Sequence, residues 1–89
     1  MKEEIIKELL EKCSAYYIKI IDDSHAHKGH KGVSRNENTH FKLEIVSDQF
    51  LNKTQVKRHQ YVYELCAPFF KRGLHALSLN TMTIAEWKA

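Results

Sequence analysis

A polar, histidine-rich run in the first half of the chain most limits how the chain can fold. Residues 23–40 include two glycines and no large apolar residue except Val33. The run also contains four of the six histidines, namely His25, His27, His30 and His40. A run of this composition cannot be buried in a core, so we expect an exposed loop between two segments that do pack.

The histidines of this loop make it the first candidate for chemistry. Imidazole is the commonest metal ligand in proteins and titrates near neutral pH. Three imidazoles within six residues, at His25, His27 and His30, can bind ions such as zinc or nickel. The same composition also fits a solvated connection without a function, and composition alone leaves both interpretations open.

The totals fit one small domain that spans residues 1–89. The net charge of +3 permits an anionic partner but does not indicate one. No apolar run approaches the roughly 20 residues of a membrane span, and the acidic residues after Met1 do not fit a secretory signal. We therefore expect a cytoplasmic protein without membrane contact. Cys13 and Cys66 lack CxxC spacing and are predicted to be reduced core residues.

Hydrophobic periodicity predicts an α+β fold of seven elements. Apolar residues recur at helical spacing in residues 2–14, and they alternate with polar residues in 39–47. The expected order is helix 2–14, strand 16–22, strand 39–47, helix 54–66, short helix 68–72, strand 74–82 and a last short helix from Ile84. The first two strands are expected to pair antiparallel across the histidine-rich loop.

Two local signals set the expected helix ends. Pro68 lacks an N–H group and crowds the preceding turn, so it is expected to interrupt the helix and begin a separate short one. Residues 83–86 match a capping box, with Met82 and Trp87 at the positions of a hydrophobic staple. This arrangement predicts that Trp87 is buried against the body of the domain.

Several separate motifs, in order, give the chain a family resemblance. They are Asp22-Asp23-Ser24 followed by His27, Asn38-Thr39-His40-Phe41, Val46-Ser47-Asp48-Gln49-Phe50, Lys57-Arg58-His59, Leu74-His75-Ala76-Leu77 and the closing segment 83–87. With these motifs the chain resembles the BolA-like family over essentially its whole length. The resemblance implies a fold similar to a type II KH domain, with a three-stranded mixed sheet and helices on one face.

The resemblance also implies a partner and a cofactor. BolA-like proteins share a bridging 2Fe-2S cluster with monothiol glutaredoxins, and the remaining ligands come from a glutaredoxin cysteine and glutathione. Carried over to this chain, the ligands are His27 and His75, with no cofactor expected in the isolated chain. His25 and His30 flank His27 and could replace it, whereas His40 is expected to be structural.

A nucleic-acid-binding regulator is the alternative that the KH-like fold suggests. A basic surface could be formed by Lys53, Lys57, Arg58, Lys71 and Arg72. No glycine lies between Phe50 and Arg58, so the GxxG loop with which KH domains clamp a nucleic-acid backbone is missing there. An enzyme is not expected, because no nucleophile–base pair or phosphate-binding glycine loop is recognisable.

Overall fold

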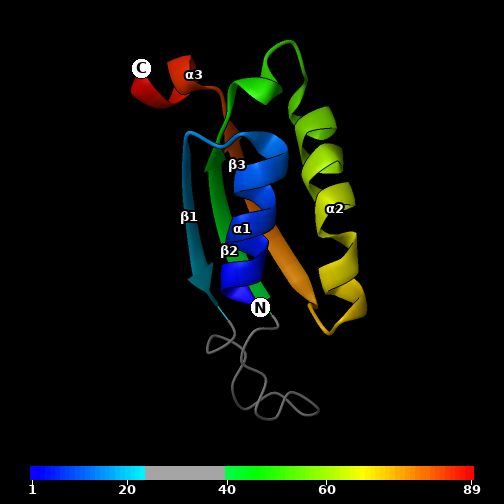
Figure 1. Cartoon of the computed structure of the whole chain (residues 1–89). Helices are drawn as coiled ribbons and strands as arrows, with labels where there is room; N and C mark the ends of the chain where they lie inside the picture. The colour runs from blue at the N-terminus through cyan, green and yellow to red at the C-terminus, as the bar shows by residue number, and fades with distance from the viewer. Residues whose placement is uncertain (24–39) are drawn as a thin grey trace.

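The computed structural model describes residues 1–23 and 40–89 (Figure 1). The predicted order of helices and strands is confirmed there, with one change in the second half. The elements are α1 (Lys2–Cys13), β1 (Tyr17–Asp22), β2 (His40–Val46), the 3-10 helix η2 (Asp48–Phe50), α2 (Gln55–Lys71), β3 (Ala76–Met82) and α3 (Ile84–Lys88).

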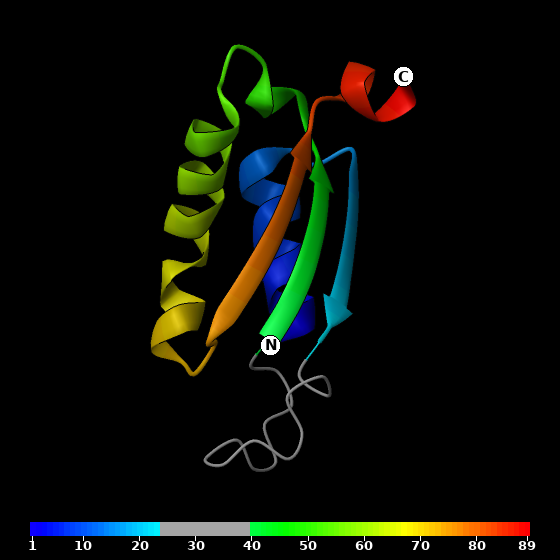
Figure 2. The same ribbon diagram turned by 180° about the vertical axis from the view of Figure 1, so that it is seen from behind.

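The three strands form the predicted mixed sheet, with β2 in the centre. Strand β1 pairs antiparallel with β2 and places Tyr17 opposite Val46. Strand β3 pairs parallel with β2 and places His40 opposite Ala76. Helices α1 and α2 lie on one face of the sheet, and none of the described helices covers the other face (Figures 1 and 2). The chain is thus an α+β domain of two layers.

The core lies between the sheet and the two long helices. Strand β2 alternates as expected, with Phe41, Leu43 and Ile45 buried and Lys42 exposed. The helices add a row of fully or nearly fully buried side chains, namely Ile5, Leu9, Cys13, Val62, Cys66 and Phe69. The sheet is therefore held by its one apolar face, which leaves the opposite face free to carry polar groups.

The prediction of a helix break at Pro68 is wrong. Helix α2 continues through Pro68 to Lys71 instead of ending at residue 66 and starting again. Phe69, directly after the proline, is only 7% exposed and packs in the core. Pro68 itself is exposed, on a side of the helix where water can replace the missing N–H donor. Burial of the following aromatic residue therefore favours a continuous helix.

The prediction that Trp87 is buried is also wrong, although the cap before it is confirmed. The Thr83 hydroxyl accepts from the Glu86 N–H at 3.2 Å, and the Glu86 carboxylate accepts from the Thr83 N–H at 2.8 Å. Trp87 remains 38% exposed. Its ring stacks on Tyr17 with centroids 4.9 Å apart. Helix α3 is short and starts directly after β3, so the indole reaches the beginning of β1 and not the core.

A buried arginine connects α2 to the C-terminal segment. Arg58 is 6% exposed, and its guanidinium forms two hydrogen bonds to the Glu86 carboxylate, at 2.7 and 3.1 Å. It also donates to the carbonyl of Lys53 at 3.0 Å and to that of Thr81 at 3.4 Å. One side chain thus satisfies acceptors from α3, from β3 and from the turn before α2.

We predict that Arg58→Ala lowers the free energy of unfolding by roughly 2 to 3 kcal/mol, because it removes the donor to the Lys53 carbonyl and the partner of the Glu86 carboxylate, and it opens a cavity where the side chain is buried. Arg72→Ala is the matched control, since Arg72 forms a similar bidentate pair with Glu4 at the surface. The control should keep its urea midpoint. Equal losses in both variants would show that Arg58 contributes no more than an exposed ion pair.

The pair of Arg58 and Glu86 should make the free energy of unfolding depend on pH in the acidic range. Hydrogen bonds from the Arg58 guanidinium and then from the Thr83 N–H lower the pKa of Glu86 from 4.5 to about 2. The folded protein thus holds this carboxylate ionised. Its contribution to the free energy of unfolding is complete above about pH 4.5 and is lost as the pH falls toward 2. Urea melts between pH 6 and 2 should show a shallower decline for Glu86→Gln than for wild type. Glu3→Gln, on an exposed position of α1, should keep the wild-type slope.

Candidate functional site

One end of the sheet carries His40 and His75, two of the histidines that the sequence singled out. Because β2 and β3 run parallel, their first residues lie side by side, and the last residues of antiparallel β1 lie at the same end. The Asp23 N–H donates to the His40 carbonyl at 2.7 Å. The two residues that flank segment 24–39 are thus joined, at the end of the sheet where His75 leads into β3 (Figure 1).

His75 is held in place by its neighbours while its own side chain stays exposed. Gly73 adopts φ +114°, in the left-handed region that favours glycine, and turns the chain from α2 toward β3. The Leu74 N–H then donates to the Phe69 carbonyl at 3.1 Å. Leu74 and Leu77 are buried on either side of His75. The backbone at His75 is therefore fixed by the core, while its imidazole is exposed.

A second imidazole lies next to His75. The rings of His40 and His75 are 5.8 Å apart between centroids, with their planes at 85°. No sequence pattern connects these two residues, and the family resemblance predicts a structural role for His40. Their contact follows from the parallel register, in which the residue opposite His40 is the one directly after His75. The contact could be predicted only from the residue-by-residue register of β2 and β3, which sequence patterns do not specify.

The other predicted ligands, His25, His27 and His30, lie outside the described residues. The structure thus places one of the two expected cluster ligands, His75. Within residues 1–23 and 40–89, no group of three or more His, Cys, Asp or Glu side chains lies close enough to hold a metal ion.

The two thiols are unsuited to metal binding. Cys13 and Cys66 are both fully buried and not joined in a disulfide, as predicted. Burial raises the pKa of Cys13 to about 11 and that of Cys66 to about 12. Both therefore stay protonated at neutral pH, and the thiolate is the form that binds metals.

The predicted basic surface is smaller than the sequence suggested. Arg58 cannot belong to it, because its guanidinium is buried against Glu86. The Arg72 side chain is exposed but paired with both oxygens of Glu4. Lys53 donates to the Gln49 carbonyl at 2.7 Å. The remaining members, Lys57 and Lys71, are exposed on α2.

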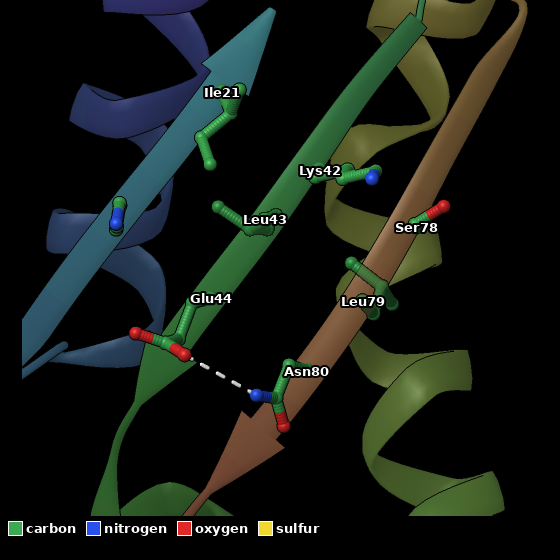
Figure 3. Close-up of a pocket in the computed structure, with 8 residues that line it drawn as sticks. Ile21, Lys42, Leu43, Glu44, Ser78, Leu79 and Asn80 are labelled. Atoms are coloured by element: carbon green, nitrogen blue, oxygen red, sulfur yellow. Dashed lines mark hydrogen bonds between the residues drawn. The ribbon is translucent and has the colours of Figure 1, made fainter. Parts of the chain in front are cut away.

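The open face of the sheet carries a hollow of about 250 Å³ with mixed charge (Figure 3). Its lining includes Lys19 and Lys42 as well as Glu44, whose carboxylate accepts from the Asn80 amide at 3.3 Å. Both charge signs are present, so this hollow shows no preference for an anion. None of the helices in the described part of the chain is long and apolar enough to cross a membrane.

The comparisons with known proteins identify the family. Residues 9–86 match the family model described as "BolA-like protein". The chain belongs to the BolA-like family. It is 35% identical over 88 residues to "DNA-binding transcriptional regulator BolA" of Haemophilus influenzae, covering 98% of this chain and 82% of that protein. That name describes the relative as a transcriptional regulator.

Plant relatives show the same domain within a longer protein and as separately solved chains. "SufE-like protein 1, chloroplastic/mitochondrial" of Arabidopsis thaliana is 43% identical over 86 residues, which cover 91% of this BolA-like chain and 23% of that protein. The solved BolA domain of SufE1 from the same plant has a TM-score of 0.85 and 39% identity, over 94% of this chain and 92% of that one. BolA1 from Arabidopsis thaliana also gives a TM-score of 0.85, at 35% identity, over 97% of this chain and 94% of that one. These similarities confirm the predicted α+β fold with its three-stranded mixed sheet.

Proposed function

We propose that this BolA-like chain is a partner of a monothiol glutaredoxin and binds a bridging 2Fe-2S cluster jointly with it. In this proposal His27 and His75 are the chain's ligands, and the complex acts in iron–sulfur cluster trafficking or iron regulation. The observation that carries the proposal is the exposed His75 imidazole at the end of the sheet where Asp23 and His40 flank segment 24–39.

The donor set of the chain fits a shared cluster better than one held by the chain alone. A 2Fe-2S cluster needs four ligands and usually takes thiolates. The thiols of Cys13 and Cys66 are buried and protonated, so this chain can offer imidazoles only. A glutaredoxin cysteine and glutathione would supply the two thiolates. His75 is accessible to such a partner because nothing from the described residues buries it.

Imidazole ligands give the proposed complex recognisable properties. Neutral imidazole in place of thiolate raises the reduction potential, as in Rieske centres. Ligation also requires a deprotonated imidazole nitrogen, so binding must compete with protons as the pH falls through about 6.5. Both properties belong to the histidines of this chain and are absent from a cluster that glutaredoxin and glutathione hold between themselves.

We predict that His27→Ala and His75→Ala each remove the contribution of this chain to the shared cluster, while His25→Ala and His30→Ala retain it. All four variants should stay folded, because His75 is exposed and the core is formed by other residues. His27→Cys should keep a cluster with a lower potential and less sensitivity to mild acid. The measurement is visible absorption and circular dichroism of the complex with glutaredoxin and glutathione.

His59→Ala is a further control, because His59 lies on α2 and is half-buried. Loss of the cluster signal in His30→Ala with retention in His27→Ala would assign the loop ligand to His30. A signal unaffected by His75→Ala would rule out the proposed role of the sheet end.

Nucleic-acid binding is the second candidate, favoured by the name of the Haemophilus influenzae relative. In this chain Lys57 and Lys71 are exposed on α2, whereas Arg58 is buried and Arg72 is paired with Glu4. So few available cations predict weak binding that depends on phosphate contacts and not on base readout.

We predict that any affinity for duplex DNA falls steeply between about 50 and 200 mM salt, because contacts between lysine side chains and phosphates weaken as the salt concentration rises. Lys57→Glu/Lys71→Glu should abolish the remaining binding, and Lys2→Glu, on α1, should preserve it. Fluorescence anisotropy with a labelled duplex measures both effects. Tight, sequence-selective binding at physiological salt would instead place DNA recognition above the cluster as the main function.

A further inference from the structure

His40 and His75 lie next to each other, but the proposed cluster site uses only His75. Strand pairing and a backbone hydrogen bond set the positions of the two residues. The parallel register places Ala76 opposite His40, and the His40 carbonyl accepts from the Asp23 N–H. The rings lie 5.8 Å apart between centroids, almost perpendicular. The half-buried His40 and the exposed His75 thus lie together at one end of the sheet.

We propose that His40 and His75 together bind one late first-row divalent ion, Cu²⁺ or Zn²⁺, with water completing the coordination. This site goes beyond the proposed function, since it needs neither glutaredoxin nor a cluster. Its ligand chemistry is imidazole nitrogen, which suits these ions and follows an affinity order that peaks at Cu²⁺.

The spacing of the rings supports a shared ion. With a metal–nitrogen distance of about 2.1 Å, two imidazoles on one tetrahedral ion have ring centroids roughly 5 to 5.5 Å apart. The observed 5.8 Å is slightly wider, so the two rings must move a little closer and turn one nitrogen each toward the shared ion. His75 is exposed and can make that movement without disturbing the core.

Two protein ligands come from the part of the chain that the structure describes. Within residues 1–23 and 40–89, no group of three or more ligand side chains gathers, and in the proposed site water fills the positions that protein does not. The buried, protonated thiols of Cys13 and Cys66 do not compete for the ion. A site of this kind binds more weakly than a closed structural zinc site, which has four protein ligands.

One consequence concerns His75, which also serves as a ligand in the cluster proposal. An ion held by His40 and His75 would compete with the cluster for the His75 imidazole. This consequence, unlike the ion site itself, rests on the proposed function.

The test uses the full chain with the variant His25→Ala/His27→Ala/His30→Ala/His59→Ala, which keeps only His40 and His75 of the six histidines. Titration with Cu²⁺, with electron paramagnetic resonance, should show one ion per chain and splitting from two imidazole nitrogens. Adding His40→Phe or His75→Ala should lower the affinity at least tenfold and leave the splitting of one imidazole. His40→Phe keeps an aromatic ring against His75 and removes only the nitrogens, and circular dichroism checks that each variant is folded.

Equal Cu²⁺ affinity with and without His40→Phe would overturn the proposal. So would splitting from a single imidazole nitrogen in the variant that keeps only His40 and His75, because that spectrum indicates an adventitious ion only. The cluster experiment is separate from this one. His40→Phe should retain the glutaredoxin-shared cluster. Failure of the Cu²⁺ experiment would therefore contradict the ion site alone, and failure of the cluster experiment would contradict the proposed function alone.

Discussion

The parallel pairing of β2 with β3 is the constraint on which the candidate site depends. Parallel neighbours cannot be joined by a tight turn, so the chain must cross the sheet from the end of β2 to the start of β3. Helix α2 makes that crossing and buries Val62, Cys66 and Phe69 against the sheet. The crossing returns the chain to the end where β2 begins, and this return brings His75 to His40. A site built from distant residues thus follows from one pairing.

Much of the fold was predictable because it rests on local rules. The alternation in β2 requires only that one face of a strand is buried, and Phe41, Leu43 and Ile45 are buried as that pattern indicates. Thr54 and Thr83 begin their helices because each side chain accepts an N–H that would otherwise have no partner. Signals of this kind lie within a few residues of the feature that they specify.

The errors arise where a distant contact outweighs a local rule. Pro68 disfavours a helix, but burial of Phe69 in the core holds α2 together beyond it. A basic residue on a helix is normally solvated, yet Arg58 is buried because its partner Glu86 comes from the C-terminal helix. The ring contact between His40 and His75 depends likewise on strand register. Such long-range partners cannot be recognised from spacing in one sequence, so only a part of the candidate site was foreseeable.

The distribution of charge and donors bears on which function the chain can perform. Its net charge of +3 could suggest affinity for nucleic acid. Two of the arginines that would supply it instead hold α2 to other elements, Arg58 through Glu86 and Arg72 through Glu4. The thiols are likewise inside the core, whereas imidazoles are presented at the end of the sheet. A chain that exposes its nitrogen donors and buries its thiols would need thiolate from another molecule to hold an iron–sulfur cluster, which is the arrangement that the proposed shared cluster supplies.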